Sequence, residues 1–117
     1  MTDPGIHEEW LTGRIASGLG EFDQAASSLQ SVRSSFLAAD LPLDASLVTL
    51  DLAELRLAQG HLAAVHTLAQ ETLSVFEQQE VPAEAARAIH LLARAAATER
   101  LSAALLARLR RSLDRRA

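Results

Sequence analysis

The sequence predicts an all-α fold, and three observations support this: residue usage, apolar periodicity and an internal repeat. Alanine, leucine and arginine are the most frequent residues of the chain, and these three, like the glutamate and glutamine that accompany them, are good helix formers. Tyrosine is absent and β-branched and aromatic residues are sparse, so the chain has little material for strands. The length of 117 residues fits a single domain with a hydrophobic core of its own.

Glycine and proline divide the first half of the chain into helices. The first helix is expected from about Ile6 to Ser17, because the glycines of the 18–20 turn tolerate the left-handed conformation at a helix end. A second helix is expected from Glu21 to Asp40, where Leu41-Pro42 ends it. Its apolar residues recur at spacings of three and four and form one stripe: Phe22, Ala25, Ala26, Leu29, Val32 and Phe36.

The second half repeats this rhythm. A third helix is expected from Pro42 to Gly60 and a fourth from about His61 to Glu80, where Val81-Pro82 breaks the chain again. The fifth helix is expected to start at Pro82 and the sixth near Thr98 or Glu99. Six helices make three antiparallel hairpins, with units of approximately residues 6–41, 42–81 and 82–117.

Sliding the sequence against itself by forty residues shows the repeat directly. The scarce residue types carry the comparison, because Gly20 falls on Gly60, Phe36 on Phe76 and Pro42 on Pro82. Small residues recur too, and Gly13, Ala53 and Ala93 occupy equivalent places on the first helix of each hairpin. A small side chain there lets paired helices approach closely.

These residues give the chain a resemblance to the tetratricopeptide repeat family. Gly13, Gly20, Ala25 and Pro42 match the family pattern in the first unit, and Ala53, Gly60 and Pro82 match it in the second. The unit departs from the family's usual 34 residues, so the resemblance is to the longer-unit members. Val65 replaces the alanine of the second unit, and Arg100 stands where the third unit needs its turn glycine.

The resemblance implies a right-handed α-solenoid and a concave groove lined by the first helix of each hairpin. The side chains that it places in this groove, for a protein or peptide partner, are His7, Trp10, Arg14, Leu47, Leu50, Glu54, Arg87, His90 and Arg94. Aromatic and arginine side chains are enriched in protein interfaces. Two alternatives stay open: Trp10 packs the open end of the stack, and Leu47 and Leu50 belong to the core.

The end of the chain carries a separate candidate surface. Residues 94–117 hold seven arginines against Glu99 and Asp114, a local net charge of +5, whereas the rest holds four arginines against thirteen acids. Cationic groups also stabilise the C-terminus of a helix, and no aromatic platform accompanies them, so a nucleic-acid interface is disfavoured. The candidate oligomer or basic tail surface consists of Leu105, Leu109, Leu113, Arg108, Arg111 and Arg115.

No pattern in the sequence indicates catalysis or a cofactor. His7, His61, His66 and His90 include no pair at the i, i+4 spacing of helical metal ligands. Gly18 and Gly20 lack the preceding strand and following lysine of a phosphate loop. Cysteine is absent, and neither a signal peptide nor an apolar run long enough for a membrane span is visible, so a cytoplasmic location is expected.

The leading hypothesis is therefore a non-catalytic scaffold for protein–protein interaction, as the docking or sensory module of a larger bacterial regulatory protein. A second hypothesis is a structural homo-oligomer, in which the leucines of the last helix meet their copies around a two-fold axis. A third is a regulator that responds to a small ligand or to nucleic acid. Fold-level resemblance alone does not choose among them.

Overall fold

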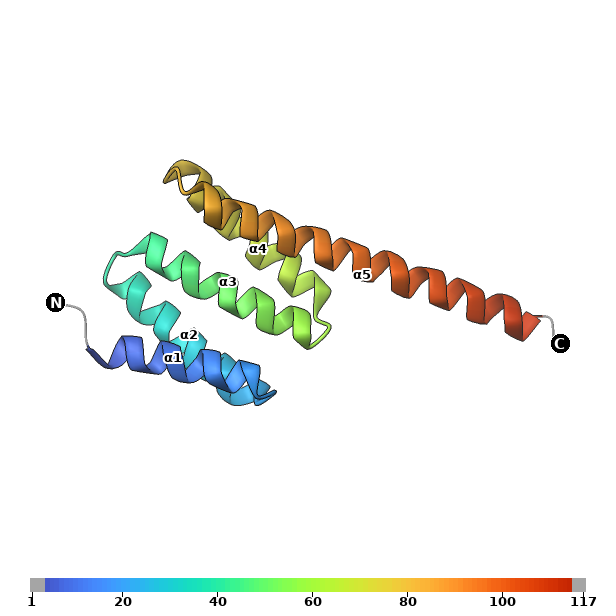
Figure 1. Cartoon of the computed structure of the whole chain (residues 1–117), viewed down its shortest axis with the longest axis horizontal. Coiled ribbons are helices and arrows are strands. Elements are labelled where there is room, and N and C mark those ends of the chain that lie inside the picture. Colours follow the sequence, from blue (N-terminus) through green and yellow to red (C-terminus); the bar gives the residue numbers. More distant parts are fainter. Residues whose placement is uncertain (1–3, 115–117) are drawn as a thin grey trace.

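The protein is built from helices alone in the part that the structure describes. The computed structural model describes residues 4–114, and these residues form five helices and no strand, which confirms the all-α prediction. Figure 1 shows how the helices are arranged. The helices are α1 (Pro4–Gly18), α2 (Phe22–Ala38), α3 (Pro42–Ala58), α4 (Leu62–Gln78) and α5 (Pro82–Asp114).

The prediction of six helices is wrong, because the expected fifth and sixth helices form one continuous helix of 33 residues, α5. Each helix break that does form has a glycine or a proline beside it, namely Gly20, Pro42, Gly60 or Pro82. The segment around Arg100 has neither. Alanine, leucine and arginine surround it, and all three favour the helix, so nothing stops α5 where a third turn would fall.

All four turns end the preceding helix in the same way. The middle residue of each turn has a positive φ: 77° at Gly20, 57° at Asp40, 78° at Gly60 and 56° at Glu80. The next backbone N–H donates to the carbonyl oxygen five residues earlier, at 2.9 Å in every turn. This is the Schellman arrangement, which satisfies carbonyls that the helix end leaves unpaired. The chain therefore reverses every twenty residues.

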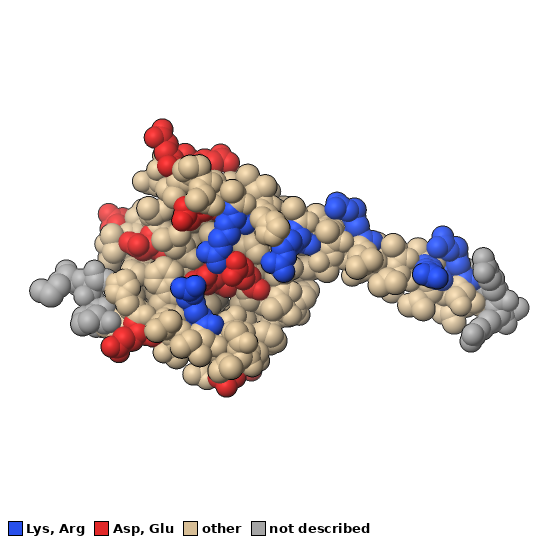
Figure 2. Space-filling view, viewed as in Figure 1, with Lys and Arg blue, Asp and Glu red and all other residues tan. Residues whose placement is uncertain are grey.

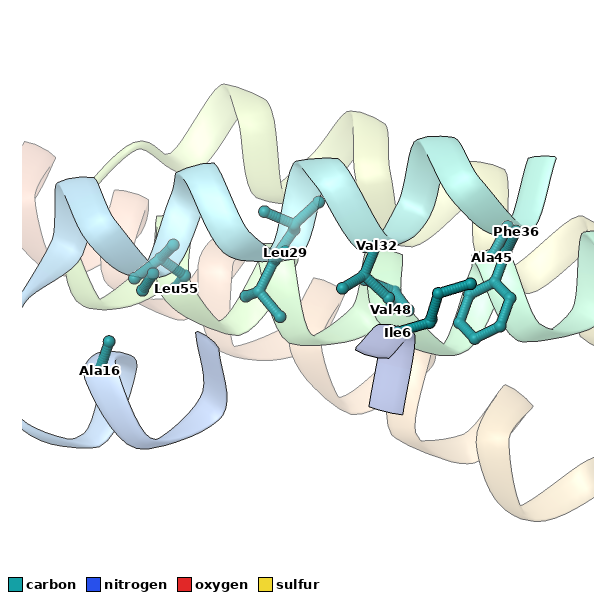
Figure 3. Packing of buried hydrophobic residues seen from close by; sticks show 10 residues of the cluster. Ile6, Ala16, Leu29, Val32, Phe36, Ala45, Val48 and Leu55 are labelled. Carbon is teal, nitrogen blue, oxygen red and sulfur yellow. The ribbon is translucent and has the colours of Figure 1, made fainter. Parts of the chain in front are cut away.

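Each helix packs against the next one along the chain, and α3 also contacts both α1 and α5. Two clusters of buried side chains result. The first joins α1, α2 and α3 (Figure 3), and includes Leu29, Val32, Phe36 and Val48. The second joins α3, α4 and α5 around Phe76. Helix α3 contributes to both clusters, so it is the central element of the helical body.

The C-terminal half of α5 extends beyond this body (Figure 1). Ala95 is the last buried residue in the described part of the chain, and every residue from 97 to 113 is exposed. The molecule is accordingly elongated, with principal extents of 67 × 31 × 19 Å. Across residues 4–114, no helix combines the length and the apolar character that a membrane crossing requires.

Close packing between α1 and α2 depends on Gly13. A Cβ added there would lie 2.9 Å from Leu29 Cδ2 and 3.2 Å from Ser28 Cβ. The equivalent Ala53 is fully buried where α3 meets α4. Ala93, by contrast, is exposed, because no sixth helix packs on the described part of α5. Close approach at this register position thus holds for the first two helix pairs only.

We expect Gly13→Ala to destabilise the protein by about 1–3 kcal/mol, because the new methyl group overpacks the contact with Leu29. Urea unfolding followed by circular dichroism measures the change. Leu29→Ala is itself costly, because Leu29 is fully buried, but Gly13→Ala should cost less in the Leu29→Ala background than in the parent, since the side chain that the methyl group meets is then gone. A Gly13→Ala protein as stable as the parent would contradict this packing.

We expect Gly60→Ala to cost about 1 kcal/mol of unfolding free energy, because a Cβ is strained at φ 78°. Gly18→Ala is the matched control, since Gly18 ends α1 without a positive φ and an added Cβ there meets no atom within 4 Å. Thermal or urea unfolding of the two variants compares them. Equal stabilities would show that the left-handed turn does not require glycine.

Candidate functional site

The candidate site is a cluster of polar side chains centred on Asp51 of α3. Trp10 of α1 donates its indole N–H to Asp51 Oδ2 at 2.6 Å. Arg87 of α5 donates from Nη2 to Asp51 Oδ1 at 2.9 Å. The Asp51 side chain is only 10% exposed. One nearly buried carboxylate therefore joins the three helices α1, α3 and α5.

Arg87 is the second bridging residue, because it also pairs with Glu54. Its Nε donates to Glu54 Oε1 at 3.0 Å, and its Nη2 lies 2.9 Å from the same oxygen. Partial burial is the largest single influence on the pKa of Arg87 and lowers it. The hydrogen bonds and negative charges of Asp51 and Glu54 together outweigh burial, so the pKa of Arg87 is raised above its ordinary value. Arg87 thus remains a cation shared by two carboxylates of α3.

Beside this cluster lies a cleft of about 270 Å³. It is lined by Arg14, Ser17 and Gly18 of α1, Leu29 of α2, and Asp51 and Glu54 of α3. Arg14 is the most accessible cation here, since its side chain is 64% exposed and its Nε lies 4.0 Å from Asp51 Oδ2. Figure 2 shows acidic and basic groups side by side in the middle of the helical body. The cleft therefore offers both charges to a ligand.

The structure brings together four of the side chains that the sequence predicts in a groove. Trp10, Arg14, Glu54 and Arg87 all surround Asp51. Trp10 also packs edge-on against Phe36, with ring centroids 5.7 Å apart. The Trp10 ring packs on α2 and its N–H bonds to α3. Trp10 therefore connects α1 to both helices and does more than cover the open end of the helices.

The prediction that Leu50 lines the groove is wrong. Its side chain is fully buried in the second core cluster, so it offers no surface to a partner. Leu47 is half-buried and packs against the same cluster. The alternative that Leu47 and Leu50 belong to the core therefore fits the structure. The residue of α3 that reaches the polar cluster is Asp51, which follows Leu50 directly.

The other predicted groove residues are exposed. His7 lies at the edge of the first cluster, with its ring centroid 6.4 Å from that of Phe36. His90 and Arg94 lie on the exposed surface of α5, and neither side chain has a hydrogen bond or ion pair within the described part of the chain. Arg94 is therefore available to an external anion, whereas Arg87 is already paired.

The predicted tail surface is exposed as a whole, as far as the structure describes it. Exposed fractions are 52% for Leu105, 60% for Leu109 and 68% for Leu113. Arg108 and Arg111 are exposed on the same helix. Arg115 lies outside the described residues. The described members of this surface lie on the part of α5 that projects from the helical body, away from the Asp51 cluster (Figure 1).

Asp51 itself was not predicted as a site residue, although the sequence carries a signal for it. It is the single charged residue within the apolar run from Leu47 to Ala53. A carboxylate flanked by core leucines needs a partner when it is buried. What the sequence could not show is which distant residues supply that partner, because Trp10 and Arg87 lie on other helices.

Comparison with protein-family models, with curated proteins and with solved structures gave no significant match. Among residues 4–114, no group of three or more histidine, aspartate or glutamate side chains is arranged to hold a metal ion. The site is therefore interpreted from its geometry: a fixed ion-pair cluster of Asp51, Glu54 and Arg87 bordered by the exposed side chains of Arg14 and Arg94.

We expect Asp51→Ala to destabilise the protein by about 1–3 kcal/mol, because it leaves the half-buried Trp10 N–H without an acceptor and frees one side of Arg87. Trp10 is the only tryptophan, so its fluorescence should shift as well. Glu54→Ala is the control, since Glu54 is an exposed partner and its loss should cost less than about 1 kcal/mol. Equal losses would contradict a central role for Asp51.

Proposed function

We propose that the chain is a tetratricopeptide-like helical repeat domain and a non-catalytic protein-interaction scaffold, acting as the docking or sensory module of a larger bacterial regulatory protein. Its support is the twenty-residue spacing of the helix reversals and the contacts of α3 with both α1 and α5. Helices at alternate positions in such a series share one face, which a partner can bridge.

The observation that carries this proposal is the composition of that shared face. Arg14 and Arg94 are exposed there, and His90 lies near Arg94 on α5. Between them lies the rigid cluster of Asp51, Glu54 and Arg87. A fixed centre bordered by accessible cations suits an extended peptide that carries carboxylates, because Arg94 has no side-chain partner among the described residues and Arg14 has only a long, largely exposed ion pair with Asp51.

Selection of a random peptide library on the immobilised protein tests this proposal, with the selected peptides then titrated calorimetrically. We expect acidic peptides to be enriched. Arg14→Glu and Arg94→Glu should each weaken their binding by about five- to fifty-fold, since each removes one charge-assisted contact and adds a repulsion. Arg87 is unsuitable for this test, because its reversal would break the internal cluster.

The control is Arg100→Glu, which makes the same charge change on the exposed part of α5 beyond the helical body. It should leave peptide affinity within about two-fold, since long-range charge effects are screened by salt. Enrichment of no peptide, or binding that all three variants reduce equally, would reject the shared face of α1, α3 and α5 as the docking surface.

A further inference from the structure

The projecting half of α5 has an apolar side with nothing packed on it in the described part of the chain. Leu106, Leu109 and Leu113 lie eighteen residues after Ala88, Leu91 and Ala95. Eighteen residues make about five helical turns, so both sets lie on the same side of α5. The earlier set is buried against α3 and α4, whereas the later set is more than half exposed. The core-facing side of α5 therefore continues past the end of the body.

This exposed side is a ridge rather than scattered leucines. Leu101, Leu105, Leu109 and Leu113 are spaced four residues apart, and their exposed fractions run from 52% to 68%. Residues four apart form one of the ridges by which helices interlock. Most of the stability of such a helix comes from packing of its apolar side, so a partner is expected there.

We propose that the partner is a second copy of the chain, whose projecting half of α5 packs antiparallel on this one around a two-fold axis. The axis would pass near residue 107. Leu105 of each copy then lies opposite Leu109 of the other, and Leu101 lies opposite Leu113. The ridge matches itself in this register, as an isologous interface requires.

Charge favours the antiparallel direction over the parallel one. Residues 94–117 hold seven arginines and two acids, whereas the remainder holds four arginines and thirteen acids. Parallel helices would set Arg108, Arg110 and Arg111 beside their own copies. Antiparallel helices separate the two arginine-rich ends and direct each toward the other copy's helical body, where the acids outnumber the arginines, so repulsion between the ends is reduced. Figure 2 shows basic groups along this projection.

The small residues of the helix also fit this register. Ser102 and Ser112 lie beside the leucines on the same side of α5 and meet across the pair in this register, and such small side chains let the two helices approach closely. One helical segment per copy makes an interface smaller than the roughly 1,600 Å² of a standard stable complex. We therefore expect a reversible dimer with a dissociation constant in the micromolar range.

Sedimentation equilibrium of the full chain, from micromolar to millimolar concentration, tests the dimer. The expected mass rises from the 12.6 kDa of one chain to twice that value. Leu105→Ser/Leu109→Ser should raise the dissociation constant at least about a hundredfold, because it removes the centre of the seam from both copies. Ile89→Ser is the control, since Ile89 is as exposed as Leu105 but lies on the other side of α5.

Disulfide trapping tests whether the two helices run antiparallel. The chain has no native cysteine, so any disulfide must form between the introduced residues. In the antiparallel register Ser102 of one copy lies opposite Ser112 of the other. Mixing Ser102→Cys protein with Ser112→Cys protein under mild oxidation should give a covalent dimer of the two different chains. Each variant alone should stay uncrosslinked, because its two thiols would lie roughly ten residues apart along the pair, about 15 Å.

Four results would overturn the proposal: a monomer at all concentrations, a dimer that Leu105→Ser/Leu109→Ser leaves intact, a dimer that Ile89→Ser weakens equally, or disulfides within a single variant. A compact monomer would show instead that α5 bends and covers its own leucines. Circular dichroism of the leucine variant should show unchanged helix content, which excludes unfolding as the cause of a lost dimer.

Discussion

The fold depends on one backbone constraint, a residue in the left-handed conformation after each of the first four helices, at positions twenty residues apart. Gly20, Asp40, Gly60 and Glu80 each hold a positive φ, and the N–H of the residue after each of them closes the end of the preceding helix. Glycine meets this demand without strain. At Asp40 and Glu80 the proline two residues later supplies the reason to stop, because it cannot continue the helix. Regular reversal lets α3 pack against its neighbours on both sides.

The Asp51 cluster determines the positions of α1 and α5 relative to α3. Apolar contacts alone tolerate sliding between helices, but Trp10 and Arg87 must both reach one carboxylate that is 10% exposed. Hydrogen bonds of fixed geometry therefore set where α1 and α5 lie on α3. The same bonds occupy Trp10, Glu54 and Arg87 internally, which leaves Arg14 and Arg94 as the cations that an external ligand can reach.

Much of the fold could be predicted from local sequence, and the exceptions have physical causes. Apolar stripes and glycine or proline punctuation predicted the first four helices to within a few residues. The prediction of a sixth helix was wrong because it extended the forty-residue repeat across Arg100. No glycine or proline is present there to end a helix. Arg14, Glu54 and Arg87 were among the groove residues that the resemblance to the repeat family implied. Asp51 and the burial of Leu50 depend on how α3 is rotated between two cores, which spacing within one helix does not determine.

Helix α5 lacks this constraint near Arg100, and without a stop its apolar side extends beyond the body that covers it. The most direct test is the distance between spin labels at Ile89→Cys and Ser112→Cys, measured by pulsed electron resonance with labelled chains diluted in unlabelled protein. A continuous helix places these positions roughly 35 Å apart, at about 1.5 Å per residue. A distance below about 20 Å would mean that α5 turns back near Arg100, and the projecting helix would not exist.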